Sequence, residues 1–309
     1  MKHINKFLNY LKNQNYSNKT IKDYKYILME FQKYLNSIQI IDEKNVSELH
    51  FKNYIKKYKD SNKHSIYYKS VTIIKKYFRC LQEFNYIFIS PIERIKNPKQ
   101  VVKHHPIMTK KEISDILDNL KNNHPFEIRT RAIIELLYSS ALRPGECLNL
   151  NITDINFQDK IILIKKTKTK TDRIVPVTKE ALYWINKYMF QVRNKSIGIK
   201  DNNKLFISFH TKRGITVKGM NSSLRYLFSK RKTKRFSLYS IRATSATHLF
   251  ENGMSISYLQ VLLGHKDLRA TQIYVRVSFI MLKELLKKYH PRNKLKDKME
   301  VINEISEVC

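Results

Sequence analysis

Three residues with complementary chemistry lie close together within residues 237–275. Arg242 carries a guanidinium that stays protonated, His265 follows a glycine, and Tyr274 lies nine positions after that histidine. Gly264 is expected to end a helix, because glycine tolerates a left-handed backbone, and to leave His265 at a corner that can face a ligand. A permanent cation, a donor that is neutral near pH 7 and a phenol on one scaffold are suited to a phosphodiester.

Apolar residues recur around these three with the spacing of helices. We predict two helices, separated by Asn252-Gly253, whose apolar faces contain Ala246, Leu249 and Phe250 in the first and Tyr258, Val261 and Leu262 in the second.

A further arginine, Arg143, lies in the segment ALRPGE. Because Pro144 and Gly145 follow it, we predict that Arg143 occupies a turn before a helix, with Glu146 one turn further on. An arginine at a helix entrance can bind a phosphate together with the unpaired backbone N–H groups. A purely structural Arg143–Glu146 ion pair fits the same pattern, so both interpretations stay open.

Residues 152–177 change from a helical to an alternating period. Two β-branched runs, 161–164 and 174–177, flank a polar turn and predict a β-hairpin, with a short strand before it. The turn contains four lysines, namely Lys165, Lys166, Lys168 and Lys170. Either these lysines are simply solvated at the tip, or one of them is carried into a DNA minor groove.

The composition restricts the class of protein. The chain has 309 residues with 59 Lys and Arg against 26 Asp and Glu, a net charge of +33 that indicates a polyanionic partner. It has no run of about 18 apolar residues and no signal peptide, so we expect a cytoplasmic protein without a membrane span. Its three cysteines are far apart and it lacks a glycine-rich phosphate loop, so we expect no metal and no cofactor.

The chain reads as two helical regions joined by a linker. Residues 1–97 are expected to be helical throughout, with Leu49 and Phe51 among the inward residues and most lysines on outer faces. Two prolines and the absence of an apolar period place a linker at 98–107, after which a capping box at Thr109 and Glu112 opens a second domain over 108–290. A tail, 291–309, follows. Basic residues on short helices together suit a DNA clamp, although for any single lysine a solvated surface position is the better explanation.

Taken together, these segments resemble the tyrosine recombinases, the phage integrase family, and among them the Xer-like recombinases. The motifs that carry the resemblance are ALRPGECLNL, KTKTDRIVPV, IRATSATHLFENG and LLGHKDLRATQIY, in this order. The resemblance implies a mostly α-helical fold. It consists of an N-terminal helical, SAM-like core-binding domain and an α-rich catalytic domain with a small three-stranded antiparallel sheet, which together clamp duplex DNA.

The resemblance also implies roles for individual residues. Arg143 and Arg242 match the family's two arginines, Glu146 the acidic residue after the first arginine, His265 the histidine of the LGH motif and Tyr274 the nucleophile. Lys168 matches the catalytic lysine of the hairpin, with Lys170 as the competing position. Where the family usually has a histidine three residues before the second arginine, this chain has Tyr239. A phenol can donate a hydrogen bond but exchanges protons poorly near neutrality.

The implied function is site-specific cleavage and rejoining of duplex DNA through a 3′-phosphotyrosyl intermediate, by a homotetramer or a heterotetramer with a related recombinase. Tyr239 keeps open an alternative, a DNA-binding protein of the same fold with weak or no strand exchange. A third possibility is a topoisomerase-like relaxation of DNA without exchange of partners.

Overall fold

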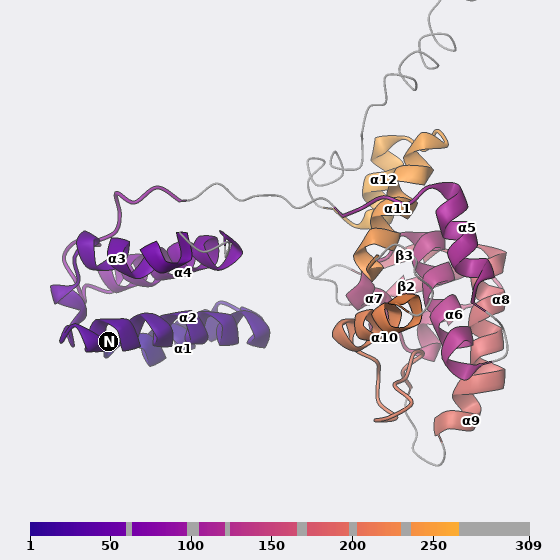
Figure 1. Ribbon diagram of the computed structural model, residues 1–309, viewed down its shortest axis with the longest axis horizontal. Coiled ribbons are helices and arrows are strands. Elements are labelled where there is room, and N and C mark those ends of the chain that lie inside the picture. The colour runs from indigo at the N-terminus through magenta and orange to yellow at the C-terminus, as the bar shows by residue number, and fades with distance from the viewer. Residues whose placement is uncertain are drawn as a thin grey trace, which may run out of the picture. The chain divides into compact units, whose positions relative to one another are not determined.

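The computed structural model describes residues 1–59, 64–97, 105–120, 124–165, 172–197, 203–229 and 236–265. The chain divides into two compact units, Met1–His104 and His105–Cys309. Figure 1 labels most of the helices and strands of both units. Each unit contains its own cluster of buried apolar side chains.

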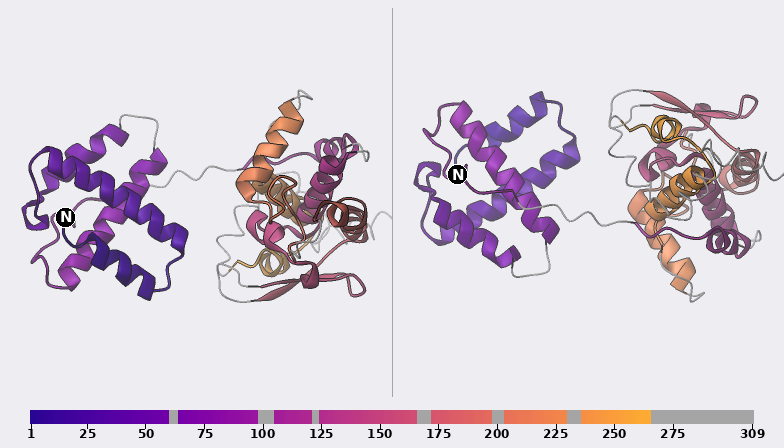
Figure 2. Two further views of the ribbon diagram at one scale, coloured as in Figure 1. Left: turned by 90° about the horizontal axis from the view of Figure 1, so that it is seen from below. Right: turned by 90° about the horizontal axis from the view of Figure 1, so that it is seen from above.

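The N-terminal unit consists of helices that cross one another (Figures 1 and 2) around a core of buried apolar side chains. Its elements are α1 (Ile4–Asn13), α2 (Asn18–Ser37), the short 3-10 turn η1 (Glu43–Asn45), α3 (Glu48–Lys59) and α4 (His64–Glu83). Ser17 caps α2 by accepting a hydrogen bond from the backbone of Thr20. Phe31 packs edge-on against Phe51 and Phe78, so α2, α3 and α4 share one core.

Two details of this unit differ from the sequence prediction. Leu49 is 63% exposed, because it lies on the outer side of the first turn of α3, whereas Phe51 is fully buried. Residues 84–97 form turns and bends rather than a helix. The Lys75 ammonium is buried and donates to the carbonyls of Glu93 and Ile95, and thus holds this returning segment against α4.

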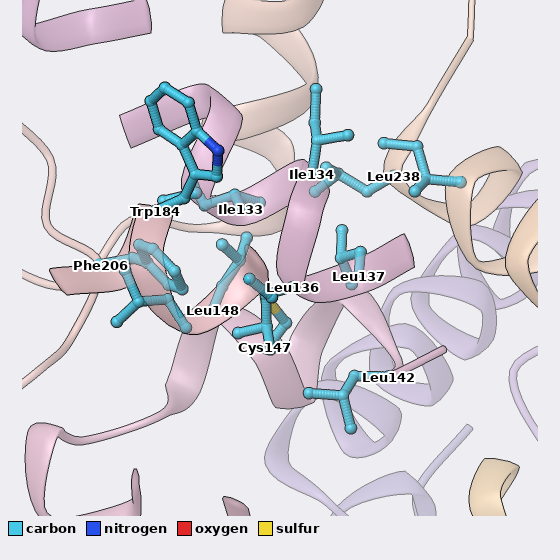
Figure 3. Close-up of a cluster of buried hydrophobic side chains, with 14 of the residues drawn as sticks. Ile133, Ile134, Leu136, Leu137, Leu142, Cys147, Leu148, Trp184, Phe206 and Leu238 are labelled. Atoms are coloured by element: carbon cyan, nitrogen blue, oxygen red, sulfur yellow. The ribbon is translucent and has the colours of Figure 1, made fainter. Parts of the chain in front are cut away.

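The second unit is built around α6, which is buried along most of its length. Its helices are α5 (Lys110–Asp118), α6 (Pro125–Ser140), α7 (Pro144–Asn149), α8 (Lys179–Tyr188), the π-helical turn η3 (Met189–Arg193), α9 (Asn194–Ile197), α10 (Val217–Ser229), α11 (Leu238–Glu251) and α12 (Ile256–Leu263). Helix α6 packs against both α8 and α11. Figure 3 shows Leu136 and Leu137 of α6 among Leu148, Trp184 and Phe206 from other elements.

A small sheet lies at the edge of these helices (Figure 2). Strands β1 (Ile155–Asn156), β2 (Ile161–Ile164) and β3 (Arg173–Pro176) pair in the order β1-β2-β3, and both pairings are antiparallel. The prediction of a mostly helical protein with a small three-stranded antiparallel sheet is therefore confirmed. In the β2–β3 pairing, Ile164 lies opposite Arg173, and the buried Val175 lies on the same face of β3 as Arg173.

The end of the described chain is a helix–turn–helix formed by α11 and α12. Ser237 and Ser255 cap the two helices, and α12 ends at Gly264 with a left-handed backbone (φ 62°). The predicted apolar face of α12 was wrong at two positions, since Tyr258 and Val261 are both 74% exposed, whereas Leu262 packs against the buried apolar side chains as predicted. Leu259 and Leu263 are buried instead, in a small cluster with Ala141 and Ala246.

Candidate functional site

Arg143 occupies the position before α7 that its sequence neighbours predict. It has an extended backbone, and Pro144 starts the helix. The Arg143 guanidinium donates from Nη1 to Glu146 Oε1 (2.8 Å) and from Nη2 to the carbonyl oxygen of Gly264 (2.9 Å). The structural Arg–Glu pair is thus present, and it leaves the Arg143 side chain 27% exposed at the surface of the unit.

Glu146 binds two arginines at once. Besides Arg143, it accepts hydrogen bonds from Arg173, from Nη1 to Oε1 (3.1 Å) and from Nη2 to Oε2 (2.8 Å). Burial alone would raise the pKa of this carboxyl, but the hydrogen bonds from Arg173 and Arg143 outweigh burial and lower the pKa to about 2. Glu146 is therefore an anion throughout the physiological range.

Sequence reasoning did not single out Arg173. A signal for it was present, since Arg173 is two residues before Val175 in a strand whose alternate residues share a face. Because Val175 is buried, Arg173 had to point toward the helices as well.

Arg242 and His265 contact each other directly. Arg242 is 3% exposed, and its Nη2 donates to the carbonyl of Leu263 (3.1 Å) and contacts His265 Nε2 (3.1 Å). A guanidinium can only donate, so Nε2 accepts and the imidazole proton resides on Nδ1. Burial, followed by the charges of Arg242, Arg143 and Arg173, lowers the pKa of His265 to about 4. The imidazole is therefore neutral at pH 7 in the absence of DNA.

The C-terminal end of α12 brings these groups together. Arg143 binds the carbonyl of Gly264 and Arg242 binds that of Leu263, so two guanidiniums from different helices are held on consecutive carbonyls. The last carbonyls of a helix lack partners within the helix and carry partial negative charge, which makes them good acceptors for cations. The turn is closed by Gln260, which exchanges hydrogen bonds with the backbone of His265.

Tyr239 lies in the first turn of α11, where it is 44% exposed. Its ring stacks on that of His105, with centroids 5.4 Å apart and planes within 13° of parallel. Tyr239 and Arg143 both line a cavity of about 580 Å³. Two lysines, Lys165 and Lys204, also line this cavity, together with the carboxylates of Glu146 and Asp154, so its walls carry three cations and two anions.

The remaining predicted residues cannot be placed. Lys168, Lys170 and Tyr274 lie outside the described residues, as does the tail 291–309. Within the part of the chain that the structure describes, no three His, Cys, Asp or Glu side chains are grouped so as to hold a metal ion. No helix in that part is both long and apolar enough to cross a membrane.

Comparison with known proteins identifies the two parts of the chain. Residues 106–280 match the model of the phage integrase family, and residues 4–83 match the phage integrase N-terminal SAM-like domain. The chain belongs to the phage integrase family. The predicted relationship to Xer-like tyrosine recombinases is confirmed by relatives of that name.

Two curated relatives and one solved structure illustrate the similarity. Tyrosine recombinase XerD of Oceanobacillus iheyensis is 31% identical over 235 residues, covering 72% of this chain and 77% of the relative. Tyrosine recombinase XerC of Halalkalibacterium halodurans is 28% identical over 298 residues, covering 94% and 97% of the two chains. The crystal structure of XerH site-specific recombinase bound to a palindromic difH substrate shares the fold, with a TM-score of 0.71, 18% identity and coverage of 89% and 81%.

Proposed function

We propose that this tyrosine recombinase cleaves and rejoins duplex DNA at a specific site through Tyr274. The observation that carries the proposal is the meeting of Arg143, Arg242 and His265 at the end of α12, nine residues before that tyrosine. Attack on a phosphodiester adds negative charge to the non-bridging oxygens. Fixed cationic donors stabilise this charge, by about 1.5–3 kcal/mol for each charge-assisted hydrogen bond.

In the proposed reaction, the Tyr274 oxygen forms a bond to phosphorus while the bond to the 5′ oxygen breaks. The phenol is ionised to only about one part in a thousand at pH 7, so it must lose its proton during attack, with Tyr239 or a water bound to it as the relay that passes the proton on to solvent. The departing 5′ oxygen takes a proton from Lys168, or from Lys170 in the alternative assignment. The 3′-phosphotyrosyl bond conserves the energy of the broken bond, so religation requires no ATP and no cofactor.

The proposed partners follow from the family. Duplex DNA is the substrate, and solved relatives include an integrase dimer on a core site and XerH on difH DNA. We expect the unit 1–97 to be the core-binding domain, 98–107 the linker and 108–290 the catalytic domain. We also expect a homotetramer or a heterotetramer on DNA, acting in the cytoplasm.

The test uses duplexes that the protein itself selects from a random pool. A nick placed near the cleavage position lets the short fragment with the freed 5′ hydroxyl diffuse away, so the covalent adduct accumulates on a denaturing gel. We expect an adduct with the natural sequence and none with Tyr274→Phe, which should still bind the duplex.

The other outcomes separate the alternatives. Binding without any adduct would indicate a DNA-binding protein of the same fold without the chemistry. Relaxation of a supercoiled plasmid bearing two selected sites, without recombinant products, would indicate topoisomerase-like activity. An adduct that survives Tyr274→Phe would refute Tyr274 as the nucleophile.

A further inference from the structure

We propose that Arg173, at the start of β3, is a positioning residue that holds the phosphate-binding arginine and the turn at the end of α12 in register. This inference rests on the proposed function, since it concerns the geometry of the same reaction. Arg173 itself is not placed against the phosphate. It acts through two neighbours, the Glu146 carboxylate and the backbone of Gly264.

The first contact is the two-bond pair with Glu146. Arg173 presents both terminal nitrogens to both carboxylate oxygens, and the same carboxylate accepts from Arg143. The Arg173 side chain is 14% exposed and that of Glu146 is 10% exposed, so water competes little for these bonds. Because a guanidinium is planar and rigid, the pair fixes the direction of the carboxylate, and the carboxylate then fixes Arg143.

The second contact is with the turn that precedes His265. A Cβ atom built on Gly264 would lie 2.9 Å from both Cζ and Nε of Arg173, closer than any real side chain approaches. The Arg173 guanidinium therefore lies directly against the Gly264 backbone. Arg143 donates to the carbonyl of that same glycine. Arg173 thus supports, from one side, the turn to which Arg143 binds and from which His265 projects.

Because of its position in the sheet, Arg173 also connects the end of a strand to the site. Arg173 pairs with Ile164 at the end of the β2–β3 ladder that leads to residues 166–171. The chain segment with the candidate general-acid lysines is thus joined, through Arg173 and Glu146, to the arginine that binds the phosphate. A shift of the strand end changes the direction of Arg143 as well.

Replacement of Arg173 is therefore expected to slow cleavage without changing the residues that touch DNA. Arg173→Gln removes the charge and the planar fork, and a misplacement of about 1 Å at a reacting group costs about 100-fold in rate. Arg173→Lys keeps the charge but can bind only one carboxylate oxygen well, so its rate should be intermediate. The matched control is Arg79→Gln, which removes the same charge and a two-bond Arg79–Glu93 pair from the N-terminal unit.

The experiment measures the single-turnover rate of adduct formation on two nicked duplexes. One has the natural 5′ oxygen and the other has sulfur at that bridging position, a leaving group that needs no proton. Lys168→Ala should be rescued by sulfur, because its defect is the missing acid. The Arg173→Gln defect should persist on the sulfur duplex, as for Arg143→Lys, because the phosphate oxygens remain poorly stabilised. Full rescue by sulfur would overturn the proposal, and so would a rate equal to that of Arg79→Gln.

A second measurement does not depend on activity. The pKa of His265, followed by NMR of its ring protons, should rise toward its ordinary value in Arg173→Gln, because a cation beside the imidazole is lost and the turn loosens. An unchanged His265 titration would contradict the positioning role. If the natural protein forms no adduct at all, the proposed function fails, while the His265 titration in Arg173→Lys, which keeps the cation but not the two-bond pair, still decides whether Arg173 orders the turn.

Discussion

The balance of charge around the end of α12 is uneven. Three guanidiniums, those of Arg143, Arg173 and Arg242, meet one carboxylate, Glu146, which binds the first two directly. Arg242 is held by a backbone carbonyl and by a neutral imidazole. With three cations and one anion, these four groups carry a net charge of +2 (3 − 1). A phosphodiester carries one negative charge, and its transition state carries two, so this excess suits the transition state.

At the residue scale, Tyr239→His should keep the cleavage rate or raise it, by up to about 100-fold. An imidazole can accept and return a proton near pH 7, which a phenol does poorly, and it can keep the stacking partner His105. The measurement is the rate of adduct formation between pH 6 and 8. A large loss of rate would show that the phenol has a role of its own.

The lowered pKa of His265 predicts how the stability of the DNA-free protein depends on pH. Its pKa is about 4 in the folded protein against 6.5 for an unperturbed imidazole, so between these values only the unfolded chain binds the proton. The free energy of unfolding should therefore fall as the pH drops from 6.5 to 4, by up to about 3 kcal/mol. Above pH 6.5 this contribution is fully present.

Denaturant titrations at several pH values test this expectation. His265→Gln should lose this part of the pH dependence, whereas His210→Gln, at an exposed loop position, should keep it. If the natural protein and His265→Gln give parallel curves between pH 4 and 6.5, the assigned environment of the imidazole is wrong.

At the element scale, the turn after α12 depends on a glycine for two reasons. Gly264 has a φ of 62°, and a side chain there would collide with the Arg173 guanidinium. Gly264→Ala should destabilise the fold by about 1–2 kcal/mol from the backbone alone. It should also lose cleavage activity, because the collision displaces Arg173 from Glu146.

Gly253→Ala is the matched control, since Gly253 also has a positive φ (96°) but has open space where a Cβ would be. Both variants should melt at a lower temperature, but only Gly264→Ala should lose activity out of proportion to its stability. Equal activity of the two variants would show that the Gly264–Arg173 contact has no role in cleavage.

The elements were predicted best where the sequence places apolar residues on only one face of a helix. In α2, apolar residues alternate at three and four positions between polar ones, so only one face could be buried. Helix α12 has the sequence ISYLQVLL, which is apolar on nearly all sides, and periodicity could not decide between Tyr258 and Leu259. Leu259 is buried because α12 packs against Ala246 of the preceding helix and against Ala141, which is more than a hundred positions away in the sequence.

In the candidate site too, features set by the local sequence were predictable and contacts between remote residues were not. Arg143, Glu146, Arg242 and His265 could be named because each lies at a helix start, a helix end or a recognised motif. Arg173 was missed because its partners, Glu146 and Gly264, are remote in sequence. It also follows a run of lysines, so it was treated as one more basic residue of the hairpin, and the face of the strand on which it lies was not considered.

At the scale of the whole molecule, the basic charge is mainly at the surface. Among the residues that the structure describes, the buried Lys and Arg side chains are Lys75, Arg129, Arg193 and Arg242. The whole chain contains 59 lysines and arginines and has a net charge of +33. A large positive field is thus available to attract a polyanion to either unit.

DNA affinity should consequently fall steeply with salt. If six to ten phosphates are contacted, the affinity drops by about 10³ to 10⁵ between 50 and 200 mM salt, because bound counterions are released from the DNA. Tyr274→Phe should show the same slope in a fluorescence-anisotropy titration, since the phenol adds no charge. A nearly flat salt dependence would mean that few phosphates are contacted.

The closed turn at His265 has a consequence for how far the proposed nucleophile, Tyr274, can reach. Backbone and side-chain bonds to Gln260 anchor the chain at His265, and Tyr274 follows after nine residues. Such a tether cannot exceed about 30 Å even when fully extended. A hydroxyl joined to His265 by a segment of this length has an effective concentration on the order of millimolar near His265. The nine-residue segment therefore limits Tyr274 to phosphates that lie near the turn at His265 of its own chain.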